Sequence, residues 1–243
     1  MAAKSESVRK EGGLSPEQSK RILGENLSFA AAEAYKLLRT NLNFSLSDKD
    51  TSGKIFGMTS ALQGDGKSTA SINIAYTMAQ SGGKVLLIEA DLRLPTLSKR
   101  IAVKSAPGLS NLLAGQCRGN EALQSSRMLP NLYVMTSGDI PPNPAELLGS
   151  SRMEATLKSL SEIFDVIIVD LPPVTIVPDG VIISKMVDGM VIVVRQNSST
   201  KSALNETIRQ LQFVDAKILG FVVTGADTLK KGYKYYGSYG NAK

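Results

Sequence analysis

The stretch ALQGDGKS, residues 61–68, constrains the fold of this chain more than any other. It follows a short apolar segment, residues 54–60, and precedes a run with helical spacing of apolar residues. Gly64 and Gly66 let the backbone curl so that several N–H groups point inward. A helix that begins near Lys67 adds the positive end of its dipole. A glycine-rich turn can exist without a ligand, but this strand–turn–helix context favours a polyphosphate site.

Apolar runs and helical patterns alternate along the rest of the chain. The apolar runs have the composition of strands buried on both faces, and they cover residues 84–90, 132–135, 165–170, 189–194 and 217–225. Helical patterns cover residues 28–44, 67–81, 145–163 and 200–213. This alternation predicts an α/β fold with a mostly parallel sheet and helices on both faces.

We predict three parts in the chain: a flexible lead-in at 1–27, one α/β domain at 28–228 and a flexible tail at 229–243. No run approaches the roughly 20 apolar residues of a membrane span, and the first residues lack the apolar core of a secretory signal. The single cysteine, Cys117, fits a reducing compartment. We therefore expect a cytoplasmic protein that reaches a membrane only through a partner.

Composition excludes several kinds of site. With no histidine and one cysteine, a zinc site or a histidine-based triad is excluded. Any general base must be a carboxylate, a lysine or a water chain. The net charge of +6 suits nucleic acid, an acidic membrane surface or phosphate ligands.

Three carboxylates follow apolar runs and are candidates for a metal site. Glu89 and Asp91 stand at the end of 84–90, and Asp170 ends 165–170. A single acidic residue at such a place is often only a helix cap. Together with a phosphate loop in the same sheet, the three predict a nucleotide–Mg²⁺ site. In that site Lys67 would reach the β- and γ-phosphates, and the Ser68 hydroxyl would ligate the metal.

The phosphate loop, the motif LLIEADLR and the motif IIVDLPPV together resemble the bacterial tyrosine kinases, which are P-loop NTPases related to the MinD/ParA ATPases. The resemblance runs from about residue 28 to the end of the chain and implies ATP and Mg²⁺ as cofactors. By resemblance, the catalytic residues are Lys67, Glu89, Asp91 and Asp170, and the metal residues are Ser68, Asp91 and Asp170. The nucleotide-binding residues are Gly64, Asp65, Gly66, Lys67, Ser68, Thr69 and Arg93.

The chain departs from the family pattern at several places, among them Gln63 and Asp65, which stand where the family often has proline and glutamate. Ala61 replaces the usual first glycine of the phosphate loop. Glu89 stands where the family has aspartate, the candidate for activating the tyrosine hydroxyl, and the extra C–C bond adds about 1.5 Å of reach. Lys36 replaces the first arginine of the oligomerisation motif, in which Glu33 and Arg39 remain. Lysine keeps the charge and loses bidentate geometry.

Four of the seven tyrosines stand close together near the C-terminus. By resemblance they are phosphoacceptors, namely Tyr233, Tyr235, Tyr236 and Tyr239. The family also implies phosphorylation in trans, a ring-like homo-oligomer, a membrane-anchored activator, a cognate tyrosine phosphatase and control of capsule or exopolysaccharide synthesis and export. No nucleic-acid partner is expected.

Two alternative functions remain open from the residues. A ParA/MinD-like ATPase switch would share the fold and the metal site, but residues 60–65 lack the extra lysine typical of such loops. A weakly catalytic scaffold is the other alternative, and it depends on Glu89. For the tyrosine-rich end, the alternatives are a segment with no acceptor role and a weak nucleic-acid-binding segment. The kinase-like motifs beside it favour the acceptor role.

Overall fold

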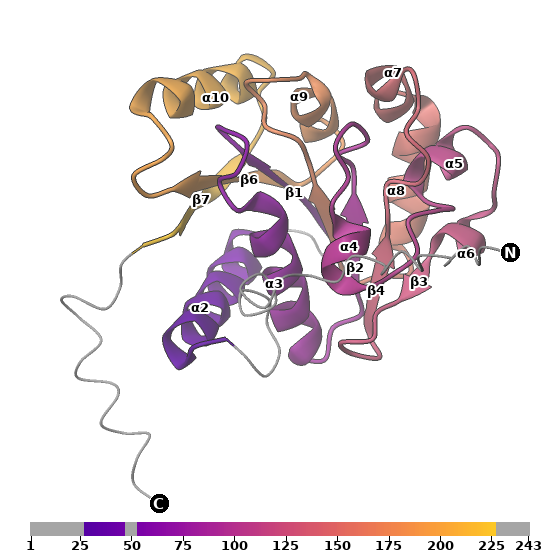
Figure 1. The fold of residues 1–243 in the computed structure, drawn as a ribbon, viewed down its shortest axis with the longest axis horizontal. Coiled ribbons are helices and arrows are strands. Elements are labelled where there is room, and N and C mark those ends of the chain that lie inside the picture. The colour runs from indigo at the N-terminus through magenta and orange to yellow at the C-terminus, as the bar shows by residue number, and fades with distance from the viewer. Residues whose placement is uncertain (1–26, 47–52, 227–243) are drawn as a thin grey trace, which may run out of the picture.

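Seven strands form one sheet in the computed structural model, which describes residues 27–46 and 53–226 (Figure 1). The strand order is β3-β4-β2-β5-β1-β6-β7, and every pairing is parallel except β3 with β4. The strands are β1 (Lys54–Ser60), β2 (Val85–Glu89), β3 (Gln124–Ser125), β4 (Leu132–Met135), β5 (Val166–Asp170), β6 (Gly189–Arg195) and β7 (Ile218–Thr224). The predicted α/β class and its mostly parallel sheet are confirmed.

Helices cover both faces of the sheet, as predicted (Figure 1). On one face pack α2 (Phe29–Ser45), α3 (Lys67–Gln80) and α4 (Leu97–Ile101). On the other pack α5 (Leu109–Leu113), α6 (Gly119–Ala122), α7 (Pro144–Leu148), α8 (Ser151–Ser161), α9 (Asp179–Ser184) and α10 (Lys201–Phe213).

The continuous apolar strands are explained by these two layers. In β1, Ile55 packs toward the α8 side and Phe56 toward the α3 side, and Leu86 and Leu87 divide in the same way in β2. All four side chains are buried. Burying such a side chain contributes about 1.5–3 kcal/mol, so the central strands are stabilised from both faces.

The single helix predicted at 145–163 is wrong, because two helices occupy this part of the chain. Helix α7 ends at Leu148 with Gly149 as its C-cap, and α8 begins after Ser150. The Ser150 hydroxyl accepts a hydrogen bond from the backbone N–H of Met153 at 3.3 Å. A serine N-cap directly after a glycine favours a new helix over continuation of the old one.

The carboxyl ends of the central strands meet at one edge of the sheet. Strand β5 lies between β1 and β2, and Asp170 stands opposite both Met58 and Glu89 in the strand register. The loop after β1 is the predicted phosphate loop. The fold therefore brings this loop and the acidic strand ends to the same edge, where ligands bind in open α/β sheets.

Candidate nucleotide site

The phosphate loop has the backbone conformation that its glycines predict. Gly64 and Gly66 have φ angles of 87° and 91°, in the left-handed region that favours glycine. Gly66 is the N-cap of α3, which begins at Lys67. The loop therefore presents the first turn of a 14-residue helix to the cleft, and such a helix end attracts anions.

Asp65 holds the phosphate loop in place from within. Its carboxylate is fully buried, and it accepts hydrogen bonds from the backbone N–H of Leu62 at 2.9 Å and the hydroxyl of Ser199 at 2.8 Å. The hydroxyl of Thr224, at the end of β7, donates to the Asp65 carbonyl at 2.5 Å. The Asp65 side chain thus contacts protein groups on both sides and braces the loop.

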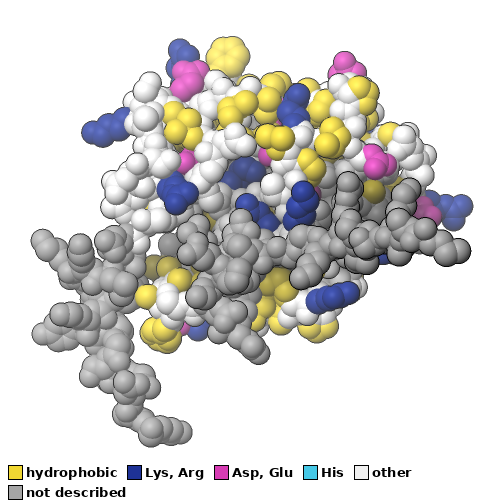
Figure 2. Space-filling view, in the orientation of Figure 1, with side chains coloured by type: hydrophobic (Ala, Val, Ile, Leu, Met, Phe, Trp, Pro, Cys, Tyr) yellow, Lys and Arg dark blue, Asp and Glu magenta, His cyan; other side chains and the backbone are white. Residues whose placement is uncertain are grey.

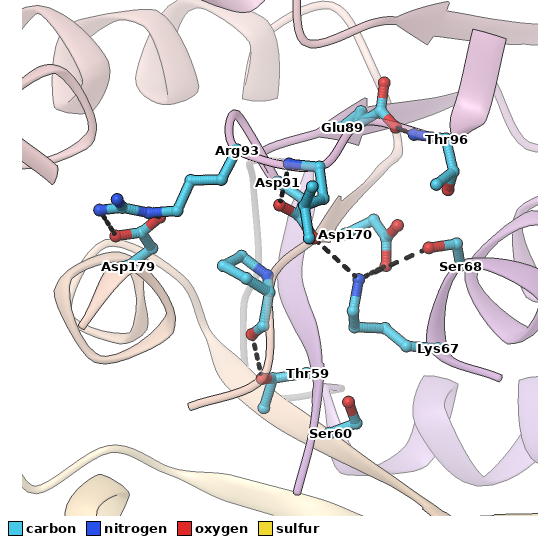
Figure 3. Close-up of polar contacts among 12 residues, drawn as sticks. Thr59, Ser60, Lys67, Ser68, Glu89, Asp91, Arg93, Thr96, Asp170 and Asp179 are labelled. Atoms are coloured by element: carbon cyan, nitrogen blue, oxygen red, sulfur yellow. Dashed lines mark hydrogen bonds and ion pairs between the residues drawn. The ribbon is translucent and has the colours of Figure 1, made fainter. Parts of the chain in front are cut away.

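Lys67 lies at the centre of a polar cluster (Figure 3). Its ammonium is 3.4 Å from Oδ1 of Asp170 and 3.8 Å from Oδ2 of Asp91, and it contacts the Ser68 hydroxyl at 3.5 Å. The structure therefore brings together the lysine, the hydroxyl and two of the three carboxylates that the sequence singles out.

Asp170 carries a buried oxygen that lacks a partner. Its Oδ1 accepts a hydrogen bond from the Ser71 hydroxyl at 3.0 Å, whereas its Oδ2 has no hydrogen bond among the residues that the structure describes. A buried polar atom without a partner costs about 1–3 kcal/mol, so such atoms are rare and point to an interaction with a ligand.

The donors in this cluster fit Mg²⁺. The carboxylates of Asp170 and Asp91 and the hydroxyl of Ser68 are hard oxygen ligands, which this ion prefers. Within residues 27–46 and 53–226, no group of three or more acidic, histidine or cysteine side chains is placed to hold a metal alone. The two carboxylates of this cluster are as many as Mg²⁺ commonly uses when substrate phosphates supply further oxygens.

Asp91 lines the cleft with a side chain that is 14% exposed. Burial raises the pKa of its carboxyl, while the nearby Lys67 ammonium and the backbone N–H of Leu94 act in the opposite direction. The Leu94 N–H donates to Oδ1 of Asp91 at 3.0 Å. This bond turns the chain sharply after β2 and leaves Oδ2 on the side of Lys67.

Glu89 points away from Lys67 and toward the start of α4 (Figure 3). Its Oε1 accepts hydrogen bonds from the backbone N–H groups of Thr96 and Leu97, each at 2.6 Å, and its Oε2 accepts one from Ser137 at 3.2 Å. The side chain is 1% exposed, and this burial raises the pKa of its carboxyl. Both oxygens of Glu89 therefore contact backbone amides, and the structure does not bring this carboxylate into the Lys67 cluster.

Arg93 forms a two-pronged ion pair. Its guanidinium contacts the carboxylate of Asp179, the first residue of α9, at 3.1 and 3.2 Å, and the Asp179 side chain is fully buried. Two further arginines border the cleft. Arg100 donates to the hydroxyl of Thr69, and Arg195 donates to the carbonyl of Gly64 at 3.2 Å.

A cleft of about 390 Å³ lies at this edge of the sheet, and the charged side chains that line it are Lys67, Asp91, Arg93, Arg100 and Arg195. Its walls come from the phosphate loop, the segment after β2, the segment after β5 and the end of β6. A larger groove of about 530 Å³ lies beside it, shares Ile176 and Val177 with it, and has no carboxylate in its lining. The smaller cleft, with its acidic and basic groups, is the candidate site.

Basic side chains gather near the middle of the face of the molecule that Figure 2 shows.

The predicted oligomerisation residues lie on α2. Glu33 and Lys36 pair with each other at 2.7 Å on the exposed side of the helix. Arg39 instead donates to the carbonyl of Thr77 in α3 at 3.0 Å, so it ties α2 to the neighbouring helix of the same chain. The predicted phosphoacceptor tyrosines, the whole predicted tail and the lead-in up to residue 26 lie outside the described residues.

Comparison with known proteins identifies the family. A family model described as an AAA domain matches residues 53–219. Tyrosine-protein kinase YwqD of Bacillus subtilis is 37% identical over 86% of this chain and 88% of its own length. Tyrosine-protein kinase CpsD of Streptococcus agalactiae is 34% identical over 86% and 89%. The chain belongs to the bacterial tyrosine-protein kinases.

Solved structures agree with this assignment. The kinase domain of Escherichia coli tyrosine kinase ETK matches this chain with a TM-score of 0.75 and 32% identity. The match covers 81% of this chain and 77% of the ETK chain. The septum site-determining protein MinD of Pyrococcus horikoshii matches with a TM-score of 0.60 at 22% identity, over 70% of each chain. The second likeness shows that the fold is shared with MinD-type ATPases.

Four residues of the site were not identified from the sequence. Ser71 is one helical turn after Lys67, so helical spacing alone places it beside the loop. Asp179 and Arg100 lie in the short helices α9 and α4, whose positions depend on tertiary contacts, and Arg195 is the last residue of β6. No local pattern in the sequence marks any of the three.

Proposed function

We propose that this kinase binds ATP and Mg²⁺ in the cleft around Lys67 and transfers the γ-phosphoryl group to tyrosines of its own C-terminal tail. The observation that carries the proposal is Oδ2 of Asp170, which lies in the same cluster as Lys67 and Ser68 and has no hydrogen-bond partner within residues 27–46 and 53–226. A buried carboxylate oxygen beside the lysine of a phosphate loop fits the need for a metal-bound nucleotide.

The residues of the cleft meet the requirements of phosphoryl transfer. The loop amides and the Lys67 ammonium stabilise negative charge on the phosphates, and Mg²⁺ supplies further charge neutralisation when it is bound. In the reaction a bond forms between the tyrosine oxygen and the γ-phosphorus, the bond from that phosphorus to the bridging oxygen breaks, and ADP leaves. The phenol proton passes to a carboxylate, and Asp91 is the acidic side chain of LLIEADLR that lines the cleft.

The tail is the proposed acceptor because the other tyrosines are built into the domain. Tyr35, Tyr76 and Tyr133 lie in α2, α3 and β4 and are all half-buried. The Tyr133 ring packs edge-on against Phe164 with the ring centres 5.3 Å apart. A tyrosine held in this way cannot enter an active site without local unfolding. The acceptors that remain are Tyr233, Tyr235, Tyr236 and Tyr239.

We further propose transfer in trans within a homo-oligomer, a membrane-anchored activator, a cognate tyrosine phosphatase, and control of capsule or exopolysaccharide synthesis. These proposals follow from membership of the family. No helix in the part of the chain that the structure describes has the length and apolar character needed to cross a bilayer. Two or three phosphates, each adding roughly −1.5 to −2 charge, would offset the tail's four lysines and favour release of subunits.

Phosphosite mass spectrometry on the chain isolated from its native host tests the acceptor proposal. The same measurement on Lys67→Met is the comparison. We expect phosphate on the four tail tyrosines in the parent only, with Tyr35, Tyr76 and Tyr133 unmodified in both. An unmodified tail together with ATP hydrolysis would contradict the proposal and favour a MinD-type ATPase switch.

A mixing experiment tests transfer in trans. Lys67→Met with an intact tail supplies acceptors without activity, and a chain with its four tail tyrosines changed to phenylalanine supplies activity without acceptors. Label on the Lys67→Met chain in the mixture would support transfer between subunits. If the mixture stays unlabelled while the parent labels itself, transfer is intramolecular.

A further inference from the structure

Glu89 fastens the N-terminal end of α4 to the end of β2. Its carboxylate accepts from two successive backbone amides at the start of the helix, Thr96 and Leu97, and from the amide of Ser137 after β4. The group is 1% exposed. Hydrogen bonds from amides to a buried carboxylate are among the stronger kinds in proteins. Glu89 therefore fixes the position of α4 relative to the sheet.

Arg100 projects from α4 to the phosphate loop. Its Nη1 donates to the hydroxyl of Thr69 at 3.1 Å, and its Nε donates to the hydroxyl of Thr96 at 3.3 Å. All three residues line the cleft. Thr69 follows Ser68 directly, in the first turn of α3, where the backbone cradles the α- and β-phosphates in loops of this kind.

Arg100 differs from Arg93 in its electrostatic surroundings. The Arg93 guanidinium is already paired with the buried carboxylate of Asp179. Across residues 27–46 and 53–226, no ion pair joins Arg100 to an acidic side chain, and its hydrogen bonds go to two neutral hydroxyls. A guanidinium has five donors in a rigid fork that matches phosphate oxygens. Arg100 therefore has both charge and donors to offer a ligand.

We propose that Arg100 binds the α/β end of the nucleotide polyphosphate, and that Glu89 is a positioning residue that holds α4 where Arg100 can do so. The inference rests on the proposed nucleotide site and adds a phosphate ligand outside the phosphate loop. It also separates the two acidic residues of LLIEADLR: Asp91 faces the cleft, and Glu89 supports its wall.

Binding of Mg²⁺–ADP and Mg²⁺–ATP to the full chain by calorimetry tests the role of Arg100. We expect Arg100→Gln to weaken the binding of both nucleotides by about tenfold, the loss of one charge-assisted contact. Arg100→Lys keeps the charge but lacks the guanidinium fork, so we expect it to restore only part of the affinity. Lys99→Gln is the matched control, because Lys99 is exposed on the same helix. The substitution removes one positive charge, as Arg100→Gln does. If Arg100→Gln binds both nucleotides as tightly as Lys99→Gln does, the proposal is wrong.

A double-mutant cycle tests the positioning role of Glu89. If Glu89 acts through Arg100, Glu89→Gln lowers the affinity for ADP severalfold in the parent chain. It lowers that affinity by less than twofold when Arg100→Gln is already present. If the two substitutions lower the affinity for ADP by independent factors that multiply in the double variant, Glu89 does not act through Arg100. A general base would behave differently, because Glu89→Gln would then lower the transfer rate at saturating ATP by about 10²-fold or more and leave ADP affinity unchanged.

The two levels of the proposal fail in different ways. If the parent chain binds neither ADP nor ATP, the proposed function itself is wrong. If the parent binds both and the Arg100 variants bind equally well, only the role of Arg100 is wrong. Far-ultraviolet circular dichroism and a melting curve for Glu89→Gln show whether the variant is folded, and the Arg100 variants carry the test if it is not.

Discussion

The phosphate loop and the segment from Glu89 to Arg100 lie on neighbouring sides of one cleft, but the chain specifies them in different ways. The loop takes its shape from glycines within it, at φ angles that other residues avoid. The second segment takes its shape from Glu89, whose side chain reaches the amides seven and eight residues ahead. One wall of the cleft is encoded locally, and the other is encoded by a contact across a turn.

This difference also separates binding from support. In the proposed nucleotide site, the backbone N–H groups of the loop would bind the phosphates, so a side-chain departure such as Ala61 removes none of the binding groups. In the second segment, side chains both line the cleft and support its wall. The carboxyl group of Asp91 lines the cleft, and that of Glu89 supports the wall. A motif with two acidic residues therefore needs a structure before roles can be given to each.

Replacing Lys67 tests the locally encoded wall and has the largest expected effect. Lys67→Met removes the charge that faces Asp170 and Asp91 and would reach the β- and γ-phosphates. We expect a loss of tail phosphorylation of about 10³-fold or more, measured by labelling with ATP. Because Lys67→Met also leaves the buried Asp170 carboxylate without its ion-pair partner, we expect a lower melting temperature than that of the Lys99→Met control, and circular dichroism shows whether the variant is still folded. Activity comparable to the control would remove the phosphate-loop assignment.

Replacing Asp170 tests the buried carboxylate that pairs with Lys67. Asp170→Asn keeps an acceptor for the Ser71 hydroxyl and removes the negative charge. We expect phosphorylation to fall by about 10²-fold, with a partial recovery as Mg²⁺ is raised. Ser71→Ala is the control, because it removes only the hydrogen bond and should cost a few-fold. A magnesium dependence identical to that of the parent would show that Asp170 does not ligate the metal.

The sequence predicts what short-range rules determine. The central strands, α3 and the loop around Gly64 and Gly66 follow from apolar runs and glycine conformations, and all are present. The predicted helix at 145–163 failed because Gly149 and Ser150 carry cap signals that periodicity alone does not weigh. Short elements such as α4 have too few residues for a periodic pattern.

The residues of the site also divide into those that local motifs identify and those whose position depends on tertiary contacts. Lys67, Ser68, Asp91 and Asp170 were identified from motifs, and the fold brings them together. The position of Arg100 was not predictable, because it depends on where Glu89 holds α4. Glu89 and Asp91 carry the same charge, and their contacts distinguish them: both oxygens of Glu89 accept from backbone amides, whereas Oδ2 of Asp91 faces Lys67.

The ion pair between Arg93 and Asp179 tests how the second wall is joined to the segment after β5. Asp179 is fully buried and Arg93 is 38% exposed, so the two single substitutions should differ. Arg93→Gln leaves a buried carboxylate without its partner and should cost about 2–3 kcal/mol. Asp179→Asn leaves an arginine that water can reach, and should cost about 1 kcal/mol. Urea unfolding measures both, and a larger loss for Asp179→Asn would contradict this account of the pair.

The two glycines of the phosphate loop give the smallest and sharpest test of local encoding. Alanine at either position must adopt a left-handed backbone, which costs about 1 kcal/mol. A Cβ at Gly64 meets nothing within 4 Å, whereas one at Gly66 lies 3.3 Å from the Thr224 hydroxyl that braces the loop. We therefore expect Gly64→Ala to lower the melting temperature by about 2–4 °C and Gly66→Ala to lower it further. Equal losses at the two positions would mean that Thr224 yields without cost, and that the brace from β7 does not help to shape the loop.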